Sequence, residues 1–455
     1  MRSRALLAAA GVVFVSACGA RSLLLDPSAT ASGSGGAGSS TTSTVAATSG
    51  PSTGPGGGPT GFCAELVAVE PLVELPPSDA KSAAHDALLQ LLGQGDVLAL
   101  MRREAIEGPT MDPSTISAVR LEPWAAWPPT IHPPVNVVAN SAAVPFVSGI
   151  EPTGTFALGI SPFPANAPPG CNLQAIYSIT PDAPPEPGAL TVHLDGKCDD
   201  FPVSVATAGD GTHFVANDVP VVDKNGSPAR GIVLHVLSTD GTTIKTPTHT
   251  CASGRLVGDV LSTEKGFVFV QSGTADFDCG STGVARQLYV RRFEGGSEVA
   301  FVAVDGNDDM VYARILPRSG GSWLIHRESG ASAEVQPPGM AIRVGAEGPV
   351  GEPFPISDAG ERRLAAAAAL GGGFVVAIVD SLGPSAPTVT LRVYSAEGAL
   401  TAQTSFPTND AWLSGDRVTL VGSPDGTSVL IGWTNISGGA AAAMFVRRFD
   451  CVNAL

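Results

Sequence analysis

The chain has 455 residues and a formal net charge of −16, with 26 basic side chains against 42 acidic ones. Hydrophobic residues make up 44% and charged residues only 15% of it, a composition that excludes general disorder and supplies a large core. The acidic balance excludes binding to nucleic acid through clustered Lys and Arg, and adhesion to anionic lipid through a basic face.

The first twenty or so residues have the pattern of an export signal. Arg2 and Arg4 precede an apolar run too short to span a bilayer, and Val15-Ser16-Ala17-Cys18 follows directly. This segment resembles the lipobox of bacterial lipoprotein signals. The resemblance implies that residues 1–17 are a cleaved signal peptide and that Cys18 carries the lipid that holds the protein at a membrane. In the enterobacterial sorting rule, Gly19 implies the outer membrane of a Gram-negative cell, with the protein in the periplasm or facing the surface.

Residues 18–62 form a segment of low complexity. They are mostly Ser, Thr, Gly, Ala and Pro, and residues 27–64 carry no charge. Such a composition cannot bury enough apolar surface to order itself. We therefore expect a flexible linker over residues 18–62 and one folded domain over residues 63–455.

Two segments near the start of the folded domain have ambiguous patterns. Residues 78–92 combine an N-cap, several leucines and a following Gly93, which is typical of a short helix inserted before the first repeat. Residues 124–134 contain Trp127 and several prolines. They fit either a recognition ledge or a packing segment stiffened by proline, and we favour the packing segment.

Short apolar strands that open with a glycine recur along the rest of the chain. Gly211, Gly266, Gly321, Gly373 and Gly426 begin them at intervals of 55, 55, 52 and 53 residues, and weaker matches begin at Gly95 and Gly154. We call these seven residues the anchor glycines. A strand-like segment precedes each anchor, and a longer strand that ends in a glycine turn follows it, as in antiparallel hairpins.

Four antiparallel strands in a period of about 50–55 residues predict an all-β fold, a β-propeller. We expect seven four-stranded blades, and the alternative is six blades with a small N-terminal subdomain. The Ser423-Pro424-Asp425-Gly426 turn resembles the turn of TolB-like propeller repeats. Residues 363–370 include five consecutive alanines, which favour a helix, but their place in the repeat predicts an inner strand.

The cysteines predict disulfides, because export leads to an oxidising compartment. With Cys18 lipidated, six remain, at positions 63, 171, 198, 251, 279 and 451. A strand after Cys63 could complete the last blade, which lacks a fourth strand, and a Cys63–Cys451 disulfide would then lock the ring. Cys171–Cys198 and Cys251–Cys279 are the economical remaining pairs, because these cysteines are expected on one face of the propeller.

No motif predicts a cofactor or a firm metal site. Asp305, Asn307 and Asp309 alternate like the start of a calcium loop, but Met310 and Leu316 replace its glycine and its glutamate, so we read a solvated turn. The seven histidines have no ligand spacing; His213 and His326 lie in or beside second strands of different blades. No phosphate loop, dinucleotide fingerprint or nucleophile elbow occurs in a suitable context.

The loops between second and third strands are long and share one face, where binding usually resides. They span residues 162–170, 219–230, 272–285, 328–339 and 381–387. We therefore expect a monomeric, lipid-anchored envelope propeller that acts as a binding or protein-interaction module, with envelope proteins or glycans as partners and no nucleic acid. The alternative is an extracytoplasmic enzyme, a glycan hydrolase or lyase, with carboxylates gathered near the channel. The third hypothesis is that the protein has a purely structural role in the envelope.

Overall fold

The computed structural model describes residues 63–453 with internal gaps. The gaps are residues 76–81, 92–94, 106–114, 139–145, 151–155, 161–174, 180–200, 209, 223–227, 241, 243, 245–247, 253–257, 274–286, 305–309, 329–336, 360–361, 381–386, 409–417 and 435–443. The lipobox with Cys18, the linker, and Cys171, Cys198 and Cys279 lie outside the described residues, as do Asp305, Asn307 and Asp309. The side chain of Cys251 is also outside them.

The described elements are 28 strands, which form seven antiparallel sheets. Blade 1 contains β2 (Ser82–Leu91), β3 (Val97–Ala105), β4 (Thr115–Glu122) and β5 (Thr130–Ile131), with β6 (Val135–Val138) also paired to β4. Blade 2 contains β7 (Phe146–Ile150), β8 (Phe156–Ile160) and β9 (Ala175–Ile179). Blade 3 contains β10 (Phe201–Thr207), β11 (His213–Val222), β12 (Pro228–Leu237) and β13 (Thr248–Ala252).

The remaining four blades follow the same order from inner to outer strand. Blade 4 contains β14 (Gly258–Ser262), β15 (Gly266–Gly273), β16 (Gln287–Glu294) and β17 (Ser297–Val304). Blade 5 contains β18 (Met310–Arg318), β19 (Gly321–Glu328), β20 (Met340–Gly345) and β21 (Gly348–Pro355). Blade 6 contains β22 (Arg362–Leu370), β23 (Gly373–Asp380), β24 (Thr388–Tyr394) and β25 (Leu400–Pro407). Blade 7 contains β26 (Val418–Gly422), β27 (Ser428–Thr434), β28 (Met444–Asn453) and β1 (Cys63–Leu75).

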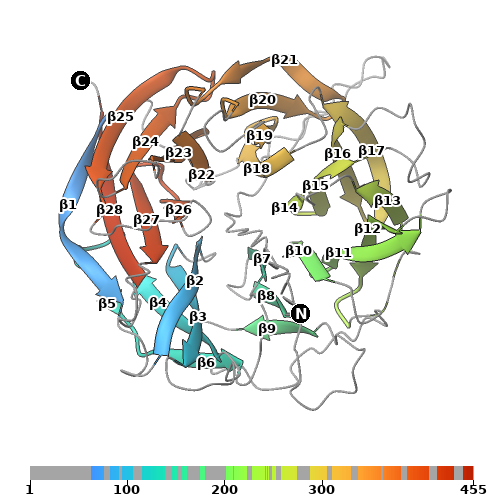
Figure 1. The fold of residues 1–455 in the computed structure, drawn as a ribbon, viewed down its shortest axis with the longest axis horizontal. Helices are drawn as coiled ribbons and strands as arrows, with labels where there is room; N and C mark the ends of the chain where they lie inside the picture. The colour runs from blue at the N-terminus through green and yellow to red at the C-terminus, as the bar shows by residue number, and fades with distance from the viewer. Residues whose placement is uncertain are drawn as a thin grey trace, which may run out of the picture.

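The seven sheets stand around a common axis, as Figure 1 shows, so the molecule is a seven-bladed β-propeller. This confirms the predicted all-β class. It also decides between the two blade counts, because β2–β6 form a blade of their own rather than a subdomain. Within the described residues, no helix is long and apolar enough to cross a membrane.

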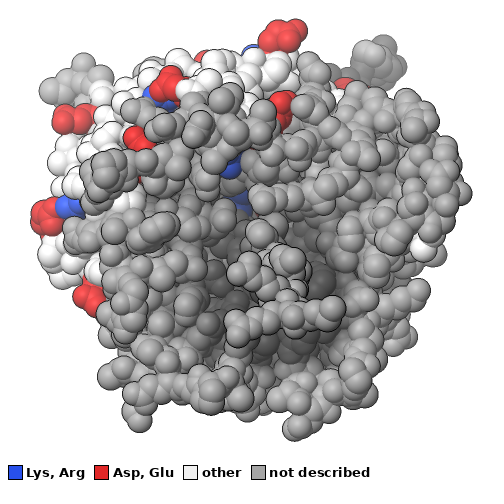
Figure 2. Space-filling model, viewed as in Figure 1, with Lys and Arg blue, Asp and Glu red and all other residues white. Residues whose placement is uncertain are grey.

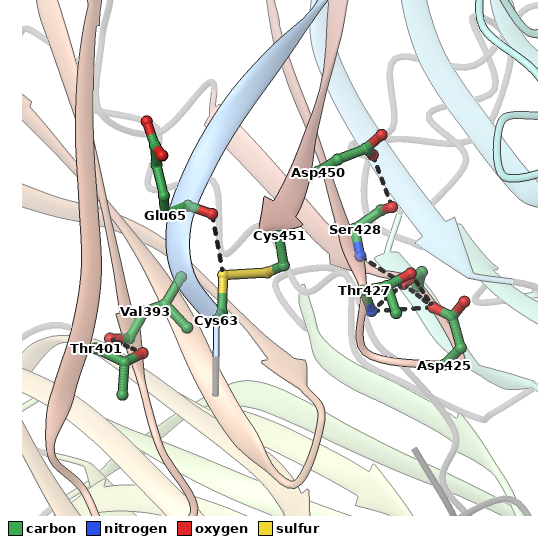
Figure 3. Close-up of a disulfide and its surroundings, with 10 residues drawn as sticks. Cys63, Glu65, Val393, Thr401, Asp425, Thr427, Ser428, Asp450 and Cys451 are labelled. Atoms are coloured by element: carbon green, nitrogen blue, oxygen red, sulfur yellow. Dashed lines mark hydrogen bonds between the residues drawn. A yellow bond between two sulfur atoms is a disulfide. The ribbon is translucent and has the colours of Figure 1, made fainter. Parts of the chain in front are cut away.

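Blade 7 is built from both ends of the described chain. β1 pairs with β28, so that Leu66 lies opposite Cys451 and Cys63 opposite Asn453. The predicted disulfide between Cys63 and Cys451 is present, with Cα atoms 5.0 Å apart and a sequence separation of 388 (Figure 3). The prediction that the segment after Cys63 completes the last blade is therefore confirmed.

The core is divided among the spaces between neighbouring blades. Each apolar cluster takes side chains from two successive blades, for instance blades 3 and 4, 5 and 6, or 7 and 1. In the first of these, the Phe214 ring lies 5.1–5.4 Å from the rings of Phe267, Phe269 and Phe293. A single sheet cannot cover its own faces, so the blades are stable only in contact with their neighbours.

A steric cause explains why glycine opens the second strand of a blade. A Cβ atom at Gly266 would lie 1.9 Å from the carbonyl oxygen of Phe293, and one at Gly373 would lie 1.9 Å from that of Tyr394. At Gly321 the distance to the carbonyl oxygen of Val344 would be 2.4 Å. In these three blades the third strand therefore approaches the second so closely that only glycine fits. Gly211 and Gly426 instead lie in turns with a positive φ, of +82° and +72°, which also favours glycine.

We expect Gly373→Ala to lower the free energy of unfolding by about 1–3 kcal/mol, because β24 must move away from the new methyl group. Chemical denaturation measures the loss. Gly345→Ala is the matched control, since its Cβ would meet only the side chain of Val350, at 3.2 Å, and the oxygen of Gly348, at 3.7 Å. Equal stability of Gly373→Ala and the unchanged protein would contradict the steric explanation.

Three local expectations can be compared with the strands. The helix expected over residues 78–92 is wrong, because the described part of this segment, residues 82–91, forms β2, which pairs with β3 along its length. The inner strand expected over residues 363–370 is confirmed as β22. The loop expected over residues 219–230 is shorter than predicted, since β11 and β12 pair from Val219 with Gly231 out to Val222 with Pro228.

Candidate functional site

The first strand of each blade lies nearest the axis of the ring (Figure 1). On these inner strands one position recurs, seven residues before each anchor glycine, and we call it the inner-strand position. Among the described side chains it is occupied by Leu88, Ser204, Asp259, Arg314, Ala366 and Thr419. All six are buried, with at most 7% of their surface exposed. Four of them are polar or charged, although the strands around them are apolar.

Two occupants of the inner-strand position bind the backbone of the next blade. The Oδ2 atom of Asp259 accepts a hydrogen bond from the N–H of Ile315 at 2.8 Å. The hydroxyl oxygen of Thr419 accepts one from the N–H of Leu89 at 3.1 Å. Ile315 and Leu89 both lie six residues before an anchor glycine, so the two bonds are equivalent in the repeat. Each one satisfies a buried N–H on the edge strand of a neighbouring sheet.

We expect Asp259→Ala to lower the free energy of unfolding by about 1–3 kcal/mol, because the buried N–H of Ile315 loses its acceptor. The guanidinium of Arg314 also loses a carboxylate, whose Oδ1 lies 3.8 Å from its Nη1 atom. Asp259→Asn keeps an oxygen acceptor and serves as the control in the same denaturation experiment. An equal loss in both variants would show that the charge, rather than the hydrogen bond, holds the blades together.

Buried polar side chains recur on the two inner strands of blades 4 and 5. We call this set the blade-5 polar cluster: Asp259, Gln271, Arg314, His326 and Arg327, each at most 9% exposed. Arg327 lies opposite Tyr312 and His326 opposite Ala313 across β18 and β19. Charged side chains are rarely buried to this extent, so the cluster is the part of the described ring where the fold departs most from an apolar core.

The cluster lies at the end of the ring where long loops were expected. Gln271 and Arg327 are among the last residues of β15 and β19, which lead into residues 274–286 and 329–336. In the view of Figure 2, the described Asp and Glu side chains are scattered around the outer part of the molecule, with a few Lys or Arg side chains among them. Arginine suits a binding site at this end of the ring because its guanidinium can hold carboxylate or phosphate groups with two hydrogen bonds.

The segment around Trp124 and Trp127 joins blades rather than forming a ledge. The indole N–H of Trp127 donates to the carbonyl oxygen of Pro71 at 2.7 Å, and that of Trp124 donates to the carbonyl oxygen of Gly95. Both rings pack against the core between blades 7 and 1. Arg448 adds a hydrogen bond of 2.7 Å to the carbonyl oxygen of Pro123. These contacts favour the packing interpretation of residues 124–134.

The turn at Ser423–Thr427 is one of several turns in which an acidic side chain accepts hydrogen bonds from neighbouring residues. The sequence pattern alone did not identify these turns as a group. The Asp425 carboxylate accepts hydrogen bonds from Ser423 and Thr427. Burial raises the pKa of Asp425, but these hydrogen bonds outweigh it and the pKa is lowered overall. At Asp240, hydrogen bonds from Ser238 and Thr242 lower the pKa to about 2.

The same arrangement recurs in two further turns. In the turn of residues 208–212, the Asp210 carboxylate accepts bonds from the N–H and hydroxyl of Thr212, and in that of residues 395–399 Ser395 donates to Glu397. The shared signal is an acidic residue followed by glycine, two residues after the turn begins. These carboxylates close hairpins between strands one and two or three and four. They therefore have a structural role.

The remaining candidate residues are not brought together. His213 begins β11 and pairs with Leu237, whereas His326 lies near the far end of β19, so the two histidines are at opposite ends of their strands. Within the described part of the chain, no group of three or more His, Cys, Asp or Glu side chains could hold a metal ion. The weak calcium candidates and Cys171, Cys198 and Cys279 fall in the gaps of the structure, and the side chain of Cys251 is not described, so the calcium site and the two other disulfide pairs stay predictions.

No family model matches the chain, and no curated protein matches it in sequence. Among solved structures, it is similar to a protein of unknown function from Dyadobacter fermentans, with 12% identity, a TM-score of 0.44, and coverage of 87% of this chain and all of that one. The propeller domain of the Trilobed protease from Pyrococcus furiosus gives 10% identity and a TM-score of 0.44, over 80% and 95% of the two chains.

An acylaminoacyl peptidase from Pyrococcus horikoshii gives 12% identity and a TM-score of 0.48 over 80% of this chain. The chain spans about half the length of that peptidase, 51%. At this level of similarity the relatives carry no information on activity. The assignment as a β-propeller therefore stands on the seven sheets themselves.

Proposed function

We propose that the protein is a lipid-anchored β-propeller of the cell envelope that binds a ligand at the long-loop end of its ring. Two features support the anchoring: the lipobox that ends at Cys18, and a composition over residues 18–62 that suits a tether. Attachment to the outer membrane of a Gram-negative cell is part of this proposal. The proposed ligand is an envelope protein or a glycan.

The contacts of the Asp259 carboxylate are the observation that favours a binding role over a catalytic one. Most glycan hydrolases use two carboxyl groups, which act as acid and base or nucleophile. Among the described side chains, Asp259 is the one carboxylate at the inner-strand position, and it contacts Ile315 and Arg314 across the blade boundary. Arg327, near the end of β19, carries the guanidinium that we propose for recognition of an acidic ligand.

A binding experiment separates the two possibilities. Peptidoglycan fragments and acidic envelope glycans are titrated against the purified protein, and we expect saturable binding that Arg327→Gln weakens at least tenfold. Asp240→Ala, at a hairpin turn outside the cluster, should leave the affinity unchanged. Turnover of any of these glycans would overturn the binding proposal in favour of the enzyme. Binding that is equal in both variants would place the site elsewhere.

The anchoring has its own test. In cells that produce Cys18→Ala, we expect the protein to leave the membrane fraction and appear in the soluble fraction. Retention in the membrane fraction would contradict anchoring by lipid at Cys18. Mass spectrometry of the amino-terminal peptide from the unchanged protein should show an acylated cysteine.

A further inference from the structure

The N-terminal segment joins the propeller at the first residue of an edge strand. Cys63 is the first residue of β1, so a pull on the preceding residues enters the fold there. β1 is the outermost strand of blade 7 and has β28 as its single neighbour in the sheet. A strand with one neighbour can be peeled away by breaking its hydrogen bonds in succession from the loaded end.

The non-covalent contacts of β1 are interrupted along its length and leave most of its side chains at least partly exposed. Of its 13 residues, Cys63, Leu66, Val73 and Leu75 are buried, and the rest are partly or fully exposed. Its pairing with β28 is interrupted twice, between Cys63 and Glu65 and between Val69 and Val73. Each interruption removes hydrogen bonds from the ladder, so β1 alone would be the first element to detach under load.

We propose that the Cys63–Cys451 disulfide transmits force applied to the N-terminal segment directly to β28. The biological purpose of this connection rests on the proposed membrane attachment. The physical claim is independent of it. While the disulfide is intact, force passes through the bond between Cys63 and Cys451, so the hydrogen bonds of β1 do not resist it alone (Figure 3).

The strand that receives the load is held on both sides. β28 pairs with β1 along one edge and with β27 along the other, and the N–H of Cys451 donates to the carbonyl oxygen of Thr427 at 2.7 Å. Arg448 of β28 binds the carbonyl oxygens of Pro123 and Trp124 in blade 1. A pull that reaches Cys451 is therefore shared between blades 7 and 1.

Single-molecule force spectroscopy on the full chain tests the proposal. One handle is placed at the amino terminus and the other at the exposed turn residue Ser319, so that the load crosses the propeller. In Cys63→Ser/Cys451→Ser, we expect an early event at no more than half the force of the first event in the unchanged protein. It should release the 13 residues of β1, about 45 Å of contour length. First events of the same force and length in both proteins would overturn the proposal.

Arg447→Gln is the matched control. It removes the ion pair between Arg447 of β28 and Glu70 of β1 but leaves the disulfide in place. We expect its first event to occur at the force of the unchanged protein. A reduction as large as that of the double cysteine variant would show that non-covalent contacts carry the load, and would overturn the proposal. Because the handles replace the lipid, failure of the anchoring proposal leaves both results unaffected.

Discussion

Replacing both Cys63 and Cys451 by serine is expected to lower the free energy of unfolding by about 5 kcal/mol. The disulfide joins residues separated by 388 positions, so it closes nearly the whole folded domain into one loop. In the chain-entropy model, a crosslink that closes so long a loop removes on the order of 5 kcal/mol of conformational freedom from the unfolded chain. Guanidinium denaturation under non-reducing conditions measures the difference.

A matched variant shows that this loss comes from the crosslink. Ser428→Ala removes the 2.8 Å hydrogen bond between the Ser428 hydroxyl and Asp450 in the same blade, and should cost about 1 kcal/mol. The double cysteine variant must lose considerably more. A similar, small loss in both would mean that the unfolded chain gains little freedom when the ring opens, and the closure would then be stabilised by its strand pairing alone.

Trp323→Ala is expected to lower the free energy of unfolding by about 3–5 kcal/mol, the usual cost of removing a large aromatic side chain from a core. Trp323 is completely buried between blades 5 and 6. Its ring lies 5.0 Å from that of Phe374 in blade 6 and 5.9 Å from that of Phe354 in its own blade. The cavity would therefore open at a boundary between two blades, where neither sheet can close it alone.

The control for this substitution is Trp323→Phe, which keeps an aromatic ring between Phe354 and Phe374 and should lose less than half as much stability. Both variants are compared by their denaturation midpoints at unchanged slope. A loss below 1 kcal/mol for Trp323→Ala would contradict the view that the packing between blades, rather than within them, stabilises the ring. Propeller stability would then have to come mainly from hydrogen bonding inside each sheet.

The regular part of the fold could be predicted because its repeat has a local steric cause. A glycine is required where the third strand approaches the second, as at Gly266 and Gly373. A turn with positive φ also favours glycine, as at Gly211 and Gly426, and both requirements leave a mark in the sequence. The closing strand could be predicted for a similar reason. Once four-stranded blades are inferred from the repeat, the missing fourth strand of the last blade and a cysteine at each end of the domain together predict the closure.

The errors arose where distant contacts decide the local structure. Residues 78–92 have a helical pattern, yet Leu89 lies in the core between blades 7 and 1 and its N–H is bound by Thr419, 330 residues away. No local pattern contains that information. The polar residues at the inner-strand position could have been found from the sequence. When the repeats are aligned on their anchor glycines, this one position holds Ser204, Asp259, Arg314 and Thr419. Their polarity within apolar strands was a readable signal of the links between blades.

The pairing of β1 with β28 also sets the order of events during synthesis. β1 is made first among the strands and its partner last, so the seventh blade cannot form until almost the whole domain has emerged. Until then β1 has no neighbour, and the edge of the growing arc of blades is open to pairing with other chains. A chain cut short before β28 would keep that open edge permanently. Ring closure thus covers this edge in finished molecules, whereas a truncated chain leaves it open to pairing with other chains.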